Sequence, residues 1–393
     1  MALRNGFLQS HFFNYRTMKK SMKKYRLLLT ATSIVVIVSA IVFTGCKKEG
    51  NLPDDPADTF DRTALLTNYA DSVIIPNFTF LDSKVDTLSI RTAAFNSSPD
   101  LTGLYALRSA FLDAYKAYQS VCAFEFGPSE TETFRTNCNT FPTDTAQIRV
   151  NISNGTYNLF LASNLDAKGF PAIDYLLYGR NTSDAAIVSY FSTSNRNAYL
   201  SDLVLHLATH TQNVLTAWTS GYRATFIASN GNSIGSSLGY VVNQLNYDLE
   251  MIKNARIGIP LGKLSLNVAL PEKCEGYYSN QSVWLASATL NNIESFYLGR
   301  SANGTNGQGL DNYLDHLGAQ YQSTSLNSVI QQRFLDAKTK LQAIPDPLST
   351  QVISNPALVD TAYVAVKRLL ILLKTDMPSN LGIVITYQDT DGD

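Results

Sequence analysis

The sequence has few of the side chains that most often perform catalysis or bind metals. Its 393 residues include four histidines and four cysteines, and only 16% are charged. A glycine-rich phosphate-binding loop and a Cys/His dyad at a recognisable spacing are missing. The chain therefore carries no sequence signature of a nucleotide-dependent enzyme or a cysteine protease.

Long hydrophobic runs are also scarce, and Leu27–Phe43 is the one that stands out. Basic residues without any acid precede it, and Phe43-Thr44-Gly45-Cys46 follows it. This pattern predicts an export signal over residues 1–45, and Cys46 resembles the lipidated cysteine of a bacterial lipobox. The alternative is a membrane-spanning anchor, but seventeen residues interrupted by threonines and serines are short for a span of about 20.

Residues 46–58 are polar and contain two prolines, so we expect them to form a flexible tether between the acyl chains and the folded part. Lys47 stands where an acidic residue would resemble an inner-membrane retention mark. We therefore expect a lipid-anchored protein of the cell envelope in the outer membrane. The sequence leaves open whether it faces the periplasm or the cell surface.

The charge balance changes once the export signal is set aside. Seven of the 31 basic residues and none of the 32 acidic ones precede Cys46, which leaves 24 basic against 32 acidic residues, a net charge of −8. An acidic chain argues against nucleic acid as a partner and against electrostatic docking on anionic lipid.

Three cysteines follow the lipidation site. In an oxidising compartment Cys122 and Cys138 are close enough in sequence to pair, which would leave Cys274 free. Three unpaired buried thiols are an equally good interpretation.

Helical periodicity dominates from Phe60 onward, and apolar residues recur every three or four positions in seven segments. These segments are Leu104–Cys122, Leu200–Trp218, Leu238–Ile252, Val283–Tyr297, Leu310–Tyr321, Val329–Ile344 and Ala357–Leu373. We predict an all-α protein of two bundles with about four helices each, over residues 59–235 and 236–393. Only Ile148–Ile152 and Ile383–Tyr387 alternate like strands.

An internal echo supports two related bundles. Ser109–Gly127 and Ser282–Gly299 both end in aromatic residues and a glycine, and each precedes a segment that begins with glycine and holds an acid, Gly169–Asp174 and Gly309–Asp311. Duplication would explain this echo, and so would a chance match of amphipathic helices.

Two carboxylates fall on apolar faces. Glu125 continues the stripe of Leu104–Cys122, and Asp174 shares a helical face with Phe170 and Leu177. Buried carboxylates are costly unless they are paired, hydrogen-bonded or metal-bound, and they are enriched at functional sites. The alternatives are a ligand site or a structural role, in which each carboxylate caps a helix or pairs with an arginine.

His206 and His210 have the i, i+4 spacing of a zinc-binding helix. The residue after His206 is Leu207 instead of the glutamate that serves as general base in metalloproteases. This favours a structural histidine pair over a metal site, and the sequence does not support metalloprotease chemistry.

Several blocks together resemble the imelysin family. They are Ala117–Pro128, Asn164–Gly179, Arg256–Gly262, Tyr277–Ser282 and Leu381–Asp393. The resemblance covers residues 60–393 in the order of the family. It implies two helical bundles related by duplication, export as a lipoprotein, a classification among peptidases and a link to iron uptake.

The chain departs from the family motif Gly-x-His-x-x-Glu. Gly169 matches, but Pro171 replaces the histidine and Asp174 the glutamate. The resemblance implies a ligand site between the bundles, made of Glu125, Asp174, Arg256, Tyr278, Ser282 and Asp311, with Glu125 and Asp174 as metal ligands. Because proline offers neither a ligand nor a proton, the departure argues against peptidase activity.

These observations predict a ligand- or metal-binding lipoprotein associated with iron uptake, which uses an acidic cleft between the bundles. Oxygen ligands would suit an iron or calcium ion, and iron-acquisition proteins would be its partners. The alternative is a metal-assisted peptidase of the imelysin type.

Overall fold

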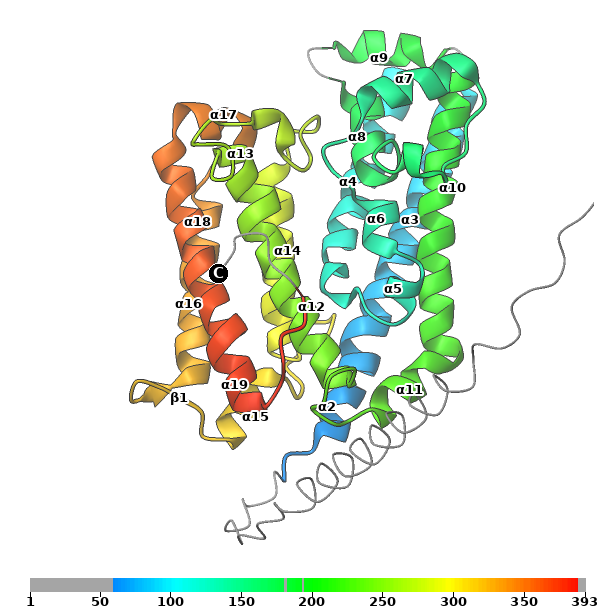
Figure 1. Cartoon of the computed structure of the whole chain (residues 1–393). Coiled ribbons are helices and arrows are strands. Elements are labelled where there is room, and N and C mark those ends of the chain that lie inside the picture. Colours follow the sequence, from blue (N-terminus) through cyan, green and yellow to red (C-terminus); the bar gives the residue numbers. More distant parts are fainter. Residues whose placement is uncertain (1–58, 180–181, 193, 388–393) are drawn as a thin grey trace, which may run out of the picture. The chain divides into compact units, whose positions relative to one another are not determined.

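The computed structural model describes residues 59–179, 182–192 and 194–387, and this part of the chain is helical almost throughout (Figure 1). The predicted signal, the lipidation site Cys46 and the tether lie outside the described residues. No helix within the described ranges is both long and apolar enough to cross a membrane.

The first bundle consists of three long helices and one short one. Helix α3 (Ile75–Ser97) packs against α4 (Leu101–Gln119) and α10 (Ser194–Ala217), and α8 (Gly169–Tyr178) packs on α10. Asp100 caps α4 by accepting a hydrogen bond from the Gly103 amide at 2.6 Å. The apolar stripe predicted for this helix is buried, as the periodicity requires.

The second bundle consists of α12 (Ser237–Met251), α14 (Ser282–Tyr297), α16 (Leu326–Gln342) and α18 (Pro356–Ile371). Figure 1 shows the two bundles next to each other, with contacts from α14 to α4 and from α12 to the turn η2 (Cys122–Phe124). The prediction of an all-α fold with two helical bundles is confirmed.

The start of the described chain contacts the second half of the sequence. Asn68, at the end of α2 (Arg62–Asn68), donates hydrogen bonds to the carbonyls of Gly299 at 2.8 Å and Gln308 at 2.9 Å. Tyr69 opens η1 (Tyr69–Ile74), and its hydroxyl accepts a hydrogen bond from the Leu310 amide. Residue 235, where we predict the boundary between the bundles, lies between α11 (Arg223–Ala228) and α12.

Shorter elements connect the long helices. They are α5 (Pro128–Thr131), α6 (Phe134–Cys138), α7 (Thr145–Asn154), η3 (Ala162–Asn164), α9 (Asp184–Tyr190), η4 (Trp218–Tyr222), α11 (Arg223–Ala228), η5 (Ile252–Gly258), α13 (Ile259–Leu261), η6 (Pro271–Lys273), α15 (Leu310–His316), α17 (Leu348–Ser354), η7 (Leu372–Asp376) and α19 (Met377–Leu381). Strands β1 (Gln320–Tyr321) and β2 (Thr324–Ser325) form one antiparallel hairpin.

Neither of the two segments that alternate like strands forms a strand. Ile148–Ile152 lies inside α7, where Asp144 caps the helix by accepting from the Ala146 and Gln147 amides. A short alternating segment is compatible with a helix as well as with a strand. Here the N-terminal cap favours the helix. The segment Ile383–Tyr387 is irregular.

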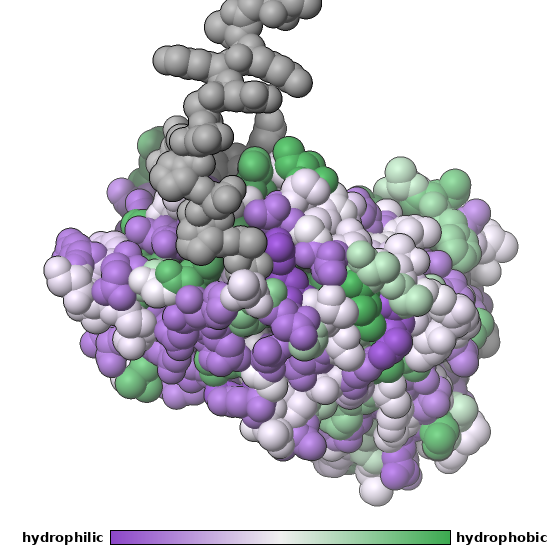
Figure 2. Space-filling view, turned by 90° about the horizontal axis from the view of Figure 1, so that it is seen from below, coloured by the Kyte–Doolittle hydropathy of each residue, from purple (hydrophilic) through white to green (hydrophobic). Residues whose placement is uncertain are grey.

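Cys122, Cys138 and Cys274 are all buried, and Cys122 does not form a disulfide with Cys138. The pairing of these two cysteines, which the sequence left open, is therefore not formed. The surface seen from below in Figure 2 is mixed, and its described part carries only small, scattered hydrophobic groups. That face offers no broad apolar patch for docking.

Candidate functional site: a buried junction and an open cleft between the bundles

Asp174 lies at the junction of the two bundles. It is 1% exposed and comes from α8, and its oxygens accept hydrogen bonds from the amides of Tyr278 at 2.9 Å and Ser279 at 3.0 Å. Burial raises the pKa of Asp174 to about 7, although these hydrogen bonds favour the charged form. The carboxyl group therefore joins α8 to the segment before α14.

A second buried group, Arg256 with Glu275, lies at the same junction. Arg256 Nε is 2.6 Å from Glu275 Oε2, and its Nη2 donates to Gln119 Oε1 at 2.9 Å. The side chains of Gln119 and Asn139 donate to Glu275 Oε1 at 3.0 and 2.7 Å. Side-chain amides of the first half of the chain thus form hydrogen bonds with charged groups from the second half.

Glu125 has different partners. It is half-buried after the end of α4, and its two oxygens lie 3.0 and 3.1 Å from the backbone nitrogen of Arg135, which donates to them. Burial raises the pKa of Glu125. The Arg135 side chain lies 3.8 Å from Asp248. Glu125 thus caps the start of α6, one of the structural roles considered from the sequence.

These residues do not fit a metal ion. Both Asp174 oxygens accept from backbone amides, and Pro171 stands at the histidine position of the family motif. Nowhere in the part of the chain that the structure describes do three or more histidine, cysteine, aspartate or glutamate side chains form a group that could hold a metal. Glu125 and Asp174 each accept hydrogen bonds from backbone amides of different segments.

The other predicted site residues lie at different places. Tyr278 packs its ring against Tyr175 at a centroid distance of 5.1 Å, and Ser282 is buried at the start of α14. Asp311 lies in α15, where burial raises its pKa to about 6. A cavity of about 20 Å³ borders Asp174 and Tyr278, which is room for about one water molecule.

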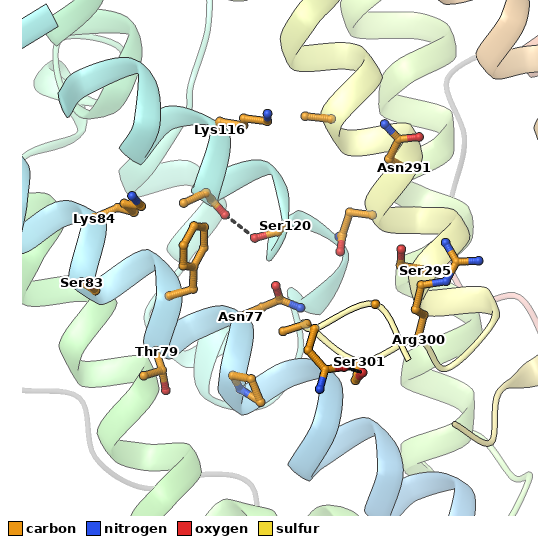
Figure 3. A pocket seen from close by; sticks show the side chains of 18 of the residues that line it. Asn77, Thr79, Ser83, Lys84, Lys116, Ser120, Asn291, Ser295, Arg300 and Ser301 are labelled. Atoms are coloured by element: carbon orange, nitrogen blue, oxygen red, sulfur yellow. Dashed lines mark hydrogen bonds between the residues drawn. The ribbon is translucent and has the colours of Figure 1, made fainter. Parts of the chain in front are cut away.

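A much larger cavity lies in the open cleft between the bundles. Its volume is about 960 Å³, in the range of small-molecule sites. Figure 3 shows polar side chains of α3 and α4 on one wall and of α14 with the loop after it on the other. None of the six predicted site residues lines it.

The charge of this cleft is opposite to the prediction. Its lining contains Lys84, Lys116 and Arg300 against one carboxylate, Asp113, which lies 3.8 Å from Lys84. Arg300 also lies 3.9 Å from Glu294, which is not part of the lining. The sequence predicts an acidic cleft from the negative charge of the part after the export signal and from the two buried carboxylates, but a net charge does not report where the charges lie. The cleft is basic.

One further donor faces the cleft. Asn292 of α14 lines the cavity, is 7% exposed, and its Nδ2 atom has no hydrogen-bond partner. Ser120 and Ser295 add hydroxyl groups from opposite walls (Figure 3). The ammonium of Lys116 lies 5.1 Å from the ring of Trp284, which places aromatic surface beside the cation. The walls thus combine cations and neutral donors with the aromatic ring of Phe80.

Sequence reasoning missed these residues because nothing in a linear pattern distinguishes them. Lys84 and Lys116 lie on the polar faces of amphipathic helices, where lysine is expected anyway. The contact of α4 with α14 makes Lys116 face the second bundle, and Lys84 lies beside it on α3, which packs against α4.

The two histidines of α10 lie away from the cleft lining. Burial and the neighbouring His210 lower the pKa of His206 to about 3, so its ring is neutral at neutral pH. Both side chains are buried.

Comparison with known proteins decides the family. The model of the imelysin family matches residues 74–373, which is most of the chain and includes both bundles. The chain belongs to the imelysin family. As a member of it, the protein keeps the two-bundle architecture but lacks the histidine of the family motif.

Individual relatives are distant. This imelysin-family protein is 22% identical over 306 residues to "Iron-regulated protein A" of Synechococcus elongatus, covering 74% of this chain and 80% of that one. An imelysin-like protein from Psychrobacter arcticum superposes with a TM-score of 0.65 at 19% identity, over 83% of this chain and 97% of that one. A structure from Parabacteroides distasonis, assigned as an iron-regulated protein A precursor, gives 0.67 at 16%, over 81% and 94%. At these identities the two structures establish the fold.

Proposed function

We propose that this protein is an exported, lipid-anchored binding protein of the cell envelope that takes part in iron acquisition and binds an anionic ligand in its inter-bundle cleft. The name of the Synechococcus relative supports the iron association, and the residues around Cys46 support the anchor. The observation that carries the proposal is the lining of the cleft, with three cationic side chains against one carboxylate.

The physical argument concerns charge and size. A cavity of about 960 Å³ accommodates a multidentate organic chelator with its ion. Opposite charges about 4 Å apart attract by about 1–4 kcal/mol between bulk water and a protein surface, and such fields also raise the association rate. Ferric ions chelated by carboxylates or catecholates are carried as anions. The cleft would hold iron through its chelator, without a protein side chain bonded to the metal.

The residues available as metal ligands and as a base give less support to the alternative function, a metal-assisted peptidase. Peptide hydrolysis by a metal needs an activated water and a base beside it. The carboxyl group at the motif position, Asp174, is committed to two backbone amides and borders a cavity for about one water. A peptide would not reach it in this conformation.

Calorimetric titration of the full-length chain with ferric citrate at low ionic strength tests the proposal. We expect binding, and we expect the double variant Lys116→Gln/Arg300→Gln to weaken it at least tenfold, about 1.4 kcal/mol. Raising the salt concentration should weaken binding to the wild type because the attraction is screened.

A matched control removes two cations elsewhere. Arg91 and Lys340 are exposed and do not line the cleft, so Arg91→Gln/Lys340→Gln has the same net charge as the cleft variant. This control should bind like the wild type. No heat of binding at millimolar ferric citrate, or equal losses in both double variants, would refute the proposal.

A further inference from the structure

The two histidines of α10 form a compact pair outside the cleft. His206 Nε2 and His210 Nε2 face each other at 3.3 Å, and the side chains are 5% and 7% exposed. They belong to one helix and are one turn apart, so the helix itself fixes their spacing. The pair does not depend on a mobile loop for its geometry.

The distance between the two nitrogens is informative. An N–H donor lies about 2.7–3.2 Å from its acceptor in an ordinary hydrogen bond, so 3.3 Å is long for one. Zinc binds histidine nitrogen at about 2.0–2.1 Å, and two ligands of a tetrahedron at that radius are about 3.3–3.4 Å apart. Neighbouring ligands in a square plane of the same radius would be about 2.9 Å apart, which disfavours Cu(II) and Ni(II).

The surroundings of His210 match those of a zinc ligand. Its Nδ1 lies 2.7 Å from Glu132 Oε2, and Asn213 also donates to that oxygen at 3.3 Å. An ionised carboxylate only accepts, so Nδ1 carries the proton and the Nε2 lone pair faces His206. Histidines that bind metals characteristically donate their second nitrogen to such a carboxylate.

We propose that His206 and His210 form a zinc site in the first bundle, with Glu132 orienting His210 from behind. The protein supplies two ligands, and solvent or a small anion fills the remaining tetrahedral positions. Catalytic zinc sites usually have three protein ligands, so this site binds zinc reversibly and is not a hydrolytic centre.

Other groups around the histidine pair affect its affinity for zinc. The carboxylate of Glu132 offsets part of the ion's charge. Lys168 acts on His206 electrostatically, but its ammonium donates to Asn137 and to the Leu159 carbonyl, at 2.6 and 2.8 Å. The exposed ring of Phe160 lies 5.5 Å from His206 and 6.4 Å from His210, so the pair is near the surface. A zinc ion can therefore reach the pair with a side-chain movement.

The test uses the full-length chain purified without a histidine tag. Cobalt(II) serves as a spectroscopic probe, because a tetrahedral cobalt complex absorbs visible light, and zinc should displace it at one equivalent. We expect His206→Asn and His210→Asn each to abolish this absorption. His316→Asn, which changes an exposed histidine of α15, should leave it unchanged.

A second variant separates zinc binding from folding. Glu132→Gln keeps both histidines, and mutation of a group that hydrogen-bonds to a metal-binding histidine typically costs about 10–100-fold in metal affinity. We expect a loss in that range, with circular dichroism unchanged. Zinc should also raise the melting temperature of the wild type but not that of His206→Asn. The proposal is overturned if the wild type shows no cobalt absorption at one millimolar, or if the His206→Asn protein folds and binds zinc as tightly.

Discussion

At the scale of single residues, burial was predictable and the partners were not. The helical face with Phe170 and Leu177 correctly placed Asp174 among apolar groups. The sequence could not show that two backbone amides more than a hundred positions later would satisfy it. Glu125 illustrates the same limit, since its partner is the backbone nitrogen of Arg135, ten residues later in α6, which no helical periodicity connects to it. A carboxylate on an apolar helical face thus predicts where two segments meet, but it does not predict which groups it binds there.

Asp174 gives a testable pH dependence. Its pKa rises from an ordinary 3.8 to about 7 in the folded chain, so the native state holds a proton that the unfolded state releases between these values. Stability must therefore fall as the pH rises from about 4 to 7, by up to about 4 kcal/mol from this group.

Urea unfolding of the wild type and of Asp174→Asn at a series of pH values isolates that contribution. Asparagine keeps one acceptor oxygen but cannot ionise, so the stability of the wild type relative to the variant should fall between pH 4 and 7 and stay level above. A constant or rising difference would show that the carboxyl group is not perturbed in this direction.

At the scale of elements, the long helices followed from their apolar stripes, and the irregular connections did not. Caps and glycines decide the short elements, as Asp144 does for α7. Gly169 begins α8 with φ +72°, a conformation that side chains with a Cβ rarely adopt. A Cβ there would lie 2.2 Å from the carbonyl oxygen of Cys138. This glycine of the family motif thus allows α8 to approach α6.

We expect Gly169→Ala to lower the free energy of unfolding by about 1–3 kcal/mol from backbone strain, and the close contact of the added Cβ should lower it further. Gly231 is the matched control, because it is exposed and its added Cβ would meet nothing closer than 3.9 Å. Gly231→Ala should change the free energy of unfolding by less than about 0.5 kcal/mol. Chemical denaturation measures both, and similar effects of the two substitutions would contradict this role of Gly169.

At the scale of the whole molecule, the two-bundle architecture was predictable, but the cleft between the bundles was not. Composition gives a net charge and periodicity gives helices, while the sign of a cleft depends on which polar faces meet. The faces of α4 and α14 bring Lys116 and Asn292 to opposite walls of one cavity. The buried junction around Arg256 and Glu275 holds the bundles together, and the open cleft beside them is available to a ligand.

A crystal of the full-length chain soaked with ferric citrate and measured at the iron absorption edge tests this division of roles most directly. The account predicts an anomalous peak for iron inside the cleft, between Lys116 and Arg300. A peak at Asp174, with the cleft unoccupied, would contradict it.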